Sequence, residues 1–219
     1  MKISASFLSI KDNLKENIDL LTKCDIDYLH LDIMDGIFVK NKTWDISEIK
    51  NLINYNKPLD VHLMVSDVYK YVDEYKDLNP EFITFHYEVD LDIMDIINYI
   101  KKYNIKVGLS IKPNTKVDEI IPYLPYLDLI LVMSVEPGEG GQKFIIDSVD
   151  KIKKLKELKE LKGDYLIEVD GGINDSTISL VKDVDIAVIG SYITSGNYEE
   201  KIKSIKEKIY GWYFVRNRK

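Results

Sequence analysis

The sequence contains one cysteine, Cys24, among its 219 residues. A single cysteine cannot close an internal disulfide and cannot build a zinc site from cysteine ligands. The sequence also lacks any apolar run of about 18 residues, the length that a membrane-spanning helix needs. Its first ten residues, MKISASFLSI, are too polar for a signal peptide. These absences predict a protein of the reducing cytoplasm with no membrane partner.

Arginine is almost missing, since Arg216 and Arg218 are the only two and both lie in the last four residues. An anionic ligand inside the fold would therefore be bound by lysine, by backbone N–H groups or by a metal ion. The 30 Lys and Arg residues against 37 Asp and Glu residues give a formal net charge of −7. That balance argues against a nucleic-acid partner, because binding to phosphate backbones requires a basic surface.

Glycine and proline are scarce, with 11 and 6 residues, which excludes a collagen-like or disordered chain. The content of 45% hydrophobic and 31% charged residues is that of an ordinary globular protein. The glycines are unevenly spread: Gly36 is the only one in the first 107 residues, and six lie in three clusters at 138–141, 171–172 and 190. Glycine lets backbone N–H groups approach an anion closely, so these clusters are candidates for a phosphate site.

Short β-branched or aromatic segments alternate with longer amphipathic segments along the chain. We predict strands at 3–8, 27–33, 59–65, 82–86, 105–110, 128–134, 165–170 and 185–190. We predict helices near 12–23, 46–55, 68–77, 92–103, 116–122, 147–162, 174–182 and 198–209. Strict alternation indicates a parallel sheet, and eight units without a linker favour a (β/α)8 TIM barrel over an open doubly wound sheet. Residues 1–219 are therefore predicted to form a single α/β barrel domain.

Two of the predicted helices carry specific signals. The segment 147–162 repeats an apolar residue at three-residue steps, at Val149, Ile152, Leu155, Leu158 and Leu161, and leaves lysine and glutamate outward. The tripeptide Asn174-Asp175-Ser176 offers N-cap chemistry for the helix predicted at 174–182.

Histidine and aspartate residues mark the ends of three predicted strands. His30 and Asp32 are two positions apart and so face the same side of their strand. His62 lies near the end of the next strand, and Asp170 ends the seventh. In a barrel these ends converge, so two imidazoles and two carboxylates would form a four-ligand site for Zn²⁺, Mn²⁺ or Fe²⁺. The alternative is that the histidines are hydrogen-bonded core residues and the aspartates are helix caps.

Other residues at the same strand ends have less specific readings. His86 closes the fourth strand and is either a fifth ligand, a substrate contact or a hydrogen-bonded wall residue, which we favour. Asp35 is interpreted as a turn or cap residue. Three methionines, which are ordinarily core residues, would form a dry lining if they converge on the mouth: Met34, Met64 and Met133. The glycine clusters follow the sixth, seventh and eighth strands, where barrel enzymes usually bind phosphate.

These residues lie in stretches that resemble the ribulose-phosphate 3-epimerase family over essentially the whole length. The stretches are SASFLS at 4–9, HLDIMDG at 30–36, VHLMV at 61–65, TFHYE at 84–88, GLSIKP at 108–113, VMSVEPGEGGQKF at 132–144, EVDGGI at 168–173 and GS at 190–191. The resemblance implies a TIM barrel that uses one divalent metal ion, Zn, Fe or Mn, and acts on a sugar phosphate in the pentose phosphate pathway. It also implies a homo-oligomer, either a dimer or a hexamer.

The resemblance also implies roles for individual residues. The implied metal ligands are His30, Asp32, His62 and Asp170. Asp32 would accept the proton in the ribulose-to-xylulose direction and Asp170 would donate one. The implied substrate contacts are Ser6, His62, Gly138, Glu139, Gly140, Gly141, Gly171, Gly172, Gly190 and Ser191, and the methionines at 34, 64 and 133 would cover the reacting carbons.

The sequence departs from the usual family pattern at several positions. The departures are Ala5, Ile10, Lys11, Ile37, Lys40 and Glu139. None of them falls on an implied ligand or acid–base residue. Glu139 places a carboxylate on the loop near the phosphate, and Ile37 and Lys40 alter the mouth or a subunit contact.

Three alternative functions are weighed against the pentose epimerase. The first is an epimerase that acts by the same mechanism on D-allulose 6-phosphate. The second is a metal-independent decarboxylase or isomerase barrel, which would usually need a strand-end lysine, and Lys112 is the only obvious candidate. The third is a non-catalytic sugar-phosphate-binding barrel, which is disfavoured because the acid–base pair of Asp32 and Asp170 is present.

Overall fold

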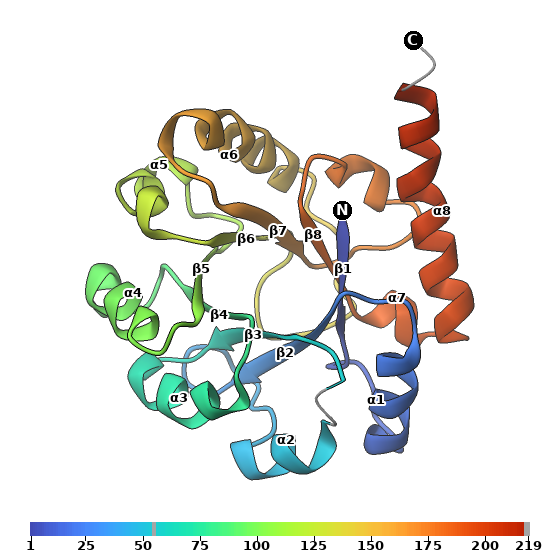
Figure 1. The fold of residues 1–219 in the computed structure, drawn as a ribbon, viewed down its shortest axis with the longest axis horizontal. Helices are drawn as coiled ribbons and strands as arrows, with labels where there is room; N and C mark the ends of the chain where they lie inside the picture. The colour runs from blue at the N-terminus through green and yellow to red at the C-terminus, as the bar shows by residue number, and fades with distance from the viewer. Residues whose placement is uncertain (54–55, 217–219) are drawn as a thin grey trace.

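Eight parallel strands close into a barrel in sequence order, and β8 pairs with β1 to complete the ring (Figure 1). The computed structural model describes residues 1–53 and 56–216, with side chains described up to Gly211. The strands are β1 (Lys2–Ser6), β2 (Tyr28–Met34), β3 (Leu59–Met64), β4 (Phe82–His86), β5 (Lys106–Ile111), β6 (Leu129–Met133), β7 (Leu166–Asp170) and β8 (Ile186–Ile189). This confirms the predicted (β/α)8 TIM barrel.

Helical segments follow the strands and surround the barrel (Figure 1). The α-helices are α1 (Leu14–Lys23), α2 (Ile46–Leu52), α3 (Val68–Tyr75), α4 (Ile93–Lys101), α5 (Val117–Ile120), α6 (Ser148–Lys162), α7 (Ser191–Thr194) and α8 (Tyr198–Arg216). The 3₁₀ segments are η1 (Lys76–Leu78), η2 (Ile121–Tyr126) and η3 (Ile178–Val181). Asp45, Asp67 and Asp92 cap α2, α3 and α4 through their carboxylates.

Each strand has one face toward the helices and one toward the barrel interior, because side chains alternate along a strand. In β2 the outward residues Leu29, Leu31 and Ile33 join the large apolar core between barrel and helices. The floor of the interior is a second apolar cluster that includes Tyr28, Phe82 and Leu131. Above that floor the interior becomes polar, and it carries the site.

Several predicted boundaries shift for local reasons. The strand predicted at 3–8 ends at Ser6, because the chain turns there and Leu8 N donates to Ser6 Oγ. The helix predicted from residue 12 begins at Leu14, since Asn13 has a left-handed backbone with φ 47°. The helix predicted at 46–55 ends at Leu52, and the last two residues of that prediction lie outside the described residues.

The largest errors are in the second half of the chain. The helix predicted at 116–122 is a single α-turn followed by the 3₁₀ segment η2, which contains Pro122 and Pro125. The helix predicted at 174–182 is only the short η3, although Asn174 Oδ1 does accept from Ser176 N and Thr177 N as a cap would. The short α7 was not predicted, and α8 continues beyond the predicted residue 209.

The three-residue repeat in α6 misplaces one residue. Ile152 and Leu155 are buried, but Leu161 is 79% exposed. A helix turns 100° per residue, so each three-residue step drifts by about 60° and three steps reach the opposite face. Leu161 therefore lies opposite Ile152, and the predicted continuous apolar face is wrong at that end.

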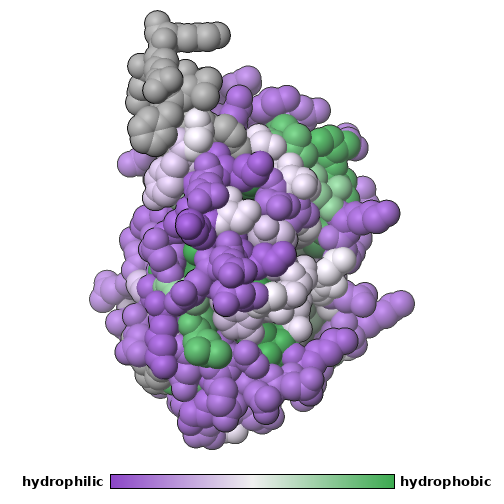
Figure 2. Space-filling model, turned by 90° about the vertical axis from the view of Figure 1, so that its right-hand side faces the viewer, coloured by the Kyte–Doolittle hydropathy of each residue, from purple (hydrophilic) through white to green (hydrophobic). Residues whose placement is uncertain are grey.

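The side of the molecule that carries α8 is largely hydrophilic, with small hydrophobic patches (Figure 2). Lys206 of α8 pairs with Asp25 at 2.5 Å, and Tyr198 Oη donates to Asn17 Oδ1 of α1 at 2.9 Å. These contacts hold the last helix beside the first, at the seam where the barrel closes. Among the described residues, no helix combines the length and apolar character that crossing a membrane demands.

Candidate active site

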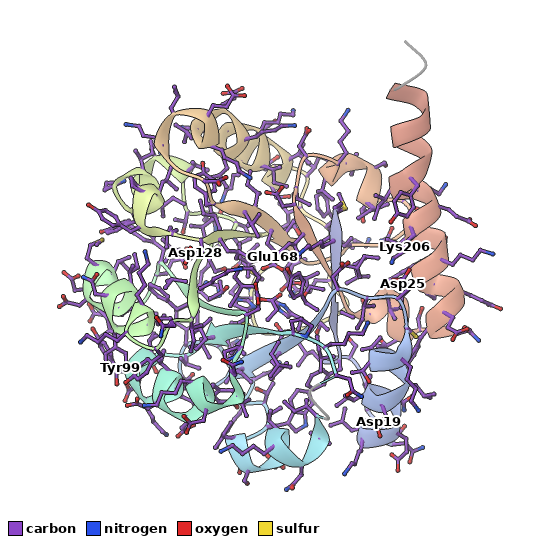
Figure 3. All side chains as sticks on the ribbon, in the orientation of Figure 1. Asp19, Asp25, Tyr99, Asp128, Glu168 and Lys206 are labelled. Carbon is purple, nitrogen blue, oxygen red and sulfur yellow. The ribbon has the colours of Figure 1, made fainter. Side chains whose placement is uncertain are left out.

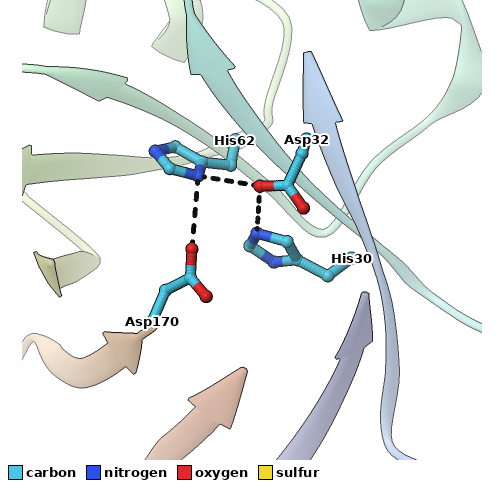
Figure 4. Close-up of side chains that lie close together, drawn as sticks. All are labelled: His30, Asp32, His62 and Asp170. Atoms are coloured by element: carbon cyan, nitrogen blue, oxygen red, sulfur yellow. Dashed lines mark hydrogen bonds and ion pairs between the residues drawn. The ribbon is translucent and has the colours of Figure 1, made fainter. Parts of the chain in front are cut away.

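Two histidines and two aspartates meet at the carboxyl ends of the strands (Figure 4). His30 and Asp32 come from β2, His62 from β3 and Asp170 from β7. One potential ligand atom from each lies within 4.8 Å of the others. Asp32 Oδ1 is 3.4 Å from His30 Nε2 and 3.3 Å from His62 Nδ1, and His62 Nδ1 is 3.9 Å from Asp170 Oδ2. The structure thus brings together the four predicted ligands.

The strand register explains this convergence. His30 and Asp32 point inward on β2, and Asp60 and His62 point inward on β3. Parallel pairing sets His30 beside Asp60 and Asp32 beside His62. The result is an upper layer that carries the candidate ligands and a lower layer that supports it.

His30 is oriented from below by Asp60. Its Nδ1 lies 2.7 Å from Asp60 Oδ2, which also accepts from Ser4 Oγ at 2.7 Å. His30 and Asp60 are both buried. A carboxylate accepts hydrogen bonds, so Nδ1 carries a proton and Nε2 faces the cluster. His30 Nε2 has no hydrogen-bond partner among the described residues.

His62 is contacted on its far side by His86. The two Nε2 atoms are 2.9 Å apart, and His86 Nδ1 lies 3.1 Å from Glu88 Oε2. Burial lowers the pKa of His86 to about 4, against the opposing effect of Glu88, so His86 is neutral at physiological pH. His86 is therefore a hydrogen-bonded wall residue and does not belong to the four-residue cluster.

The two candidate acid–base aspartates have opposite pKa shifts. Burial disfavours the charge on Asp32, but His30 and His62 outweigh it and hold its pKa well below the usual range. Burial and then the charge of Asp32 raise the pKa of Asp170 to about 6. Two carboxylates whose pKa values are driven apart by their surroundings suit a base and an acid.

A third carboxyl group lies beneath the cluster, near the centre of the barrel: Glu168, labelled in Figure 3. It is fully buried, and burial followed by the charge of Asp60 raises its pKa well above the usual range. Glu168 is therefore neutral. It lies two positions before Asp170 on β7 and so faces the same interior.

The four clustered side chains could hold a metal ion. Nitrogen and oxygen donors in a group of four suit Zn²⁺, and they also suit Mn²⁺ or Fe²⁺. His30 presents Nε2 to the cluster, 3.4 Å from Asp32 Oδ1, and its carboxylate support at Nδ1 matches the arrangement typical of metal-binding histidines. Two aspartates would balance the charge of a divalent ion. The donor set therefore fits a divalent cation.

A cavity opens above the cluster. Among the predicted site residues it is lined by Ser6, Asp32, Met34, Met64, Met133, Gly138, Glu139, Gly140, Gly141, Asp170, Gly172, Gly190 and Ser191. His30 and His62 lie buried beneath it, and Gly171 is outside the lining. Gly172 has φ +64°, and a Cβ there would lie 2.5 Å from Phe144 N, so only glycine fits. The three methionines and the glycine loops thus share one cavity.

The loops after β2 and β6 contact each other across the mouth. Asn41 Nδ2 donates to the carbonyl of Gly138 at 2.8 Å, and a Cβ on Gly138 would lie 2.9 Å from Val39 Cβ. Ile37 is 78% exposed and does not contribute to the lining. Asp35 accepts from Ile37 N, Phe38 N, Ser66 N and Ser66 Oγ, which confirms its role in the turn.

Lys112 does not line the cavity. It follows β5, and its Nζ lies over the ring of Phe38, 4.0 Å from the centroid. It is therefore not placed as the strand-end lysine that a metal-independent barrel would need.

Sequence reasoning missed the supporting layer: Ser4, Asp60, Glu88 and Glu168. Three of them do carry a simple signal, because Ser4, Asp60 and Glu168 each precede a site residue by two positions. Polar residues two apart on a barrel strand face the same interior. Glu88 follows β4 and has no such signal.

The fold and the site together define a TIM-barrel enzyme with a candidate metal centre at the carboxyl ends of its strands. The family model described as the ribulose-phosphate 3 epimerase family matches residues 2–194. The chain belongs to this family, which confirms the resemblance seen in the motifs and makes it an epimerase.

Curated relatives agree with the family match. A ribulose-phosphate 3-epimerase of Helicobacter pylori (strain J99 / ATCC 700824) is 38% identical over 198 residues, which are 88% of this chain and 90% of the relative. One from Buchnera aphidicola subsp. Schizaphis graminum (strain Sg) is 36% identical over 217 residues, covering 96% and 93%.

A solved structure supports the fold. The 3-hexulose-6-phosphate synthase from Salmonella typhimurium superposes with a TM-score of 0.69 at 17% identity, over 96% of this chain and 99% of that one.

Proposed function

We propose that the chain interconverts D-ribulose 5-phosphate and D-xylulose 5-phosphate by proton transfer at carbon 3. The observation that carries the proposal is the pair Asp32 and Asp170, with opposite pKa shifts, beside two histidines in one cavity of an epimerase-family barrel. Epimerisation requires that a proton leave one face of carbon 3 and return on the other. Two carboxylates on different strands can serve the two faces.

Asp32 is proposed as the proton acceptor in the ribulose-to-xylulose direction and Asp170 as the donor. Ser6 Oγ donates to Asp32 Oδ2 at 2.7 Å and fixes the orientation of that carboxylate. The depressed pKa of Asp32 keeps it ionised, and the pKa of Asp170, raised to about 6, makes it the more easily protonated of the two. In the reverse direction the two roles exchange.

His30, Asp32, His62 and Asp170 are proposed to hold one divalent metal ion, Zn, Mn or Fe. When bound, such an ion would stabilise the negative charge of the enediolate by several kcal/mol. The histidines would supply their bare nitrogens, and the aspartates would each use one oxygen for the ion.

The remaining lining residues are proposed to bind and shield the substrate. Met34, Met64 and Met133 are each at most 2% exposed and would exclude water from the reacting carbons. Backbone amides around Gly138, Gly140, Gly141, Gly172, Gly190 and Ser191 would hold the phosphate, with Ser6 and Glu139 as further contacts. Gly171 and His62, which lie outside the lining, are proposed as contacts on the family resemblance alone. Binding of the remote phosphate would position carbon 3 between the aspartates.

Three further proposals concern the protein as a whole. They are a single domain over residues 1–219, a homo-oligomer that is a dimer or a hexamer, and a cytoplasmic location in the pentose phosphate pathway.

The test is an activity assay with D-ribulose 5-phosphate on protein stripped of metal and then reloaded. We expect stripped protein to be inactive and Zn²⁺, Mn²⁺ or Fe²⁺ to restore turnover. Full activity of stripped protein would overturn the metal proposal. Equal or better kcat/KM with D-allulose 6-phosphate, measured on the same preparation, would overturn the choice of substrate.

A further inference from the structure

A line of hydrogen-bonding groups leads away from the cluster through His62, His86 and Glu88. His62 and His86 are fully buried, and the cavity lining includes neither His86 nor Glu88. The Nε2 atoms of the two histidines are 2.9 Å apart, and their ring centroids are 5.0 Å apart with planes inclined by 29°. At that spacing the rings meet edge to edge, so one nitrogen donates and the other accepts.

The direction of donation follows from the end of the line. The ionised carboxylate of Glu88 can only accept, so His86 Nδ1, at 3.1 Å, carries the proton. An imidazole that carries its proton on Nδ1 offers Nε2 as an acceptor, and His86 Nε2 lies 2.9 Å from His62 Nε2. His62 Nε2 therefore donates to it, and His62 Nδ1 is left without a proton. That bare nitrogen faces Asp32 and Asp170.

We propose that Glu88 is a positioning residue, which acts through His86 to hold His62 with Nε2 protonated and Nδ1 free to bind the metal ion. The inference rests on the proposed role of His62 as a ligand. Glu88 would thus have a function although its side chain touches neither the substrate nor the ion.

His62 needs this positioning because a second hydrogen-bond acceptor, Asp32, competes for its proton. Asp32 Oδ1 lies 3.3 Å from His62 Nδ1 and would favour a proton on that nitrogen. A ligand in that tautomer must lose or move its proton before it can bind a cation. The acceptor that His86 presents at the other nitrogen favours the opposite tautomer, which is ready for metal.

Glu88 is itself rigidly held. Its Oε1 accepts from Lys112 N at 2.8 Å and from Thr115 Oγ1, and Oε2 is left for His86. Lys151 of α6 donates to the carbonyls of Lys112, Pro113 and Thr115 at 2.6–2.8 Å, which fixes the loop after β5. An outer helix thus helps to orient a carboxylate that acts on the centre of the barrel.

The first test needs no variant. Long-range ¹H–¹⁵N NMR on metal-free wild-type protein at mildly alkaline pH reports which nitrogen of each of the three histidines carries the proton. We expect Nε2–H for His62 and Nδ1–H for His86. A proton on Nδ1 of His62 would overturn the inference.

The second test is Glu88→Gln, which keeps the size of the side chain. Two donors already occupy the Oε1 position, so the amide oxygen should stay there and the NH₂ group should face His86. His86 would then accept at Nδ1 and donate from Nε2, and His62 would shift its proton to Nδ1. We expect that tautomer in the NMR spectrum and a Zn²⁺ affinity lower by roughly 10–100-fold, measured by competition with a chromogenic chelator.

Two variants serve as controls. Glu88→Asp keeps an acceptor and should restore the wild-type tautomer at least in part. Glu81→Gln removes the same charge at a surface pair with Lys106 and should change neither tautomer nor affinity. If Glu88→Gln keeps the wild-type tautomer of His62 and the wild-type Zn²⁺ affinity, the proposed role of Glu88 is overturned, but the proposed metal site is not. Failure of wild-type protein to bind Zn²⁺ would instead overturn the proposed metal site.

Discussion

The two faces of the same strands have opposite chemistry. On β3 the outward residues Leu59, Val61 and Leu63 pack against the helices in the large apolar core. The inward residues Asp60 and His62 are polar and equally buried. A shift of one residue in register would exchange the two sets, so the alternation fixes both the core and the site.

The outward face of the strands stabilises the barrel, whereas the buried polar groups of the inward face lower its stability. Apolar burial on the outward face is favourable and tolerates exchange of similar side chains. Burial of charged and polar groups on the inward face is costly unless each finds a partner. The hydrogen bonds of the lower layer, such as Ser4 to Asp60, offset part of that cost and hold the upper layer in place.

The largest effect is expected on the inward face. Asp32→Asn and Asp170→Asn should each lower kcat by roughly 10²–10⁴-fold, because loss of a general acid or base typically has this effect. The unfolding free energy should change far less than the activity. Steady-state kinetics at saturating metal separates the lost proton transfer from weaker metal binding. A kcat within tenfold of wild type for either variant would contradict the assignment of catalysis to the inward face.

An outward substitution should show the reverse pattern. Leu109 on β5 is fully buried in the apolar core, and its strand carries no proposed catalytic group. Leu109→Ala should lower the unfolding free energy by about 2–5 kcal/mol and leave kcat/KM nearly unchanged below the melting transition. Denaturant titration tests this, with Leu161→Ala as control because Leu161 is 79% exposed. A large loss of kcat in Leu109→Ala would show that the two faces are not separable.

The glycine after β8 tests the proposed phosphate site at the mouth of the barrel. Gly190 lies directly after that strand, and a Cβ there would be 3.3 Å from Ser6 Cβ, in the cavity proposed to bind phosphate. Gly190→Ala should raise KM roughly tenfold, about 1.4 kcal/mol of binding energy. Gly211→Ala on α8 is the control, since a Cβ there meets nothing within 4 Å. An unchanged KM for Gly190→Ala would place the phosphate elsewhere.

The smallest expected effect is a pH dependence of metal-free stability. Asp170 has a pKa of about 6 in the fold against 3.8 ordinarily, so the folded state retains its proton to higher pH than the unfolded chain. The resulting stability is complete at pH values below the ordinary pKa of 3.8 and is lost as the pH rises to about 6. Subtracting the unfolding free energies of Asp170→Asn from those of wild type, both in chelator, isolates this slope. A flat difference, or one that rises with pH, would contradict it.

The sequence was sufficient for the barrel because its signals are repeated and local. Eight β-branched segments, separated by amphipathic stretches of similar length, restrict the topology strongly. It was insufficient for η2 and η3, where prolines or a short connection replace a regular helix. Leu161 was misplaced because a three-residue repeat only approximates the helical period.

The candidate ligands could be predicted because their spacing and strand-end positions are visible in the chain. The contacts of His30 with Asp60 and of His62 with His86 could not, because they depend on the register between strands. Glu88 was missed for a further reason. Its effect passes through a neighbour and through a loop that Lys151 orders from a distant helix.

The central claim is that two inward carboxylates exchange the proton at carbon 3 from opposite faces. The most direct test is to convert D-ribulose 5-phosphate in heavy water and to measure deuterium at carbon 3 of the D-xylulose 5-phosphate formed in the first turnovers. The account predicts solvent deuterium at that carbon in the product. Product that retains the original hydrogen at carbon 3 would mean that a single group removes and returns the proton, and would contradict the roles assigned to Asp32 and Asp170.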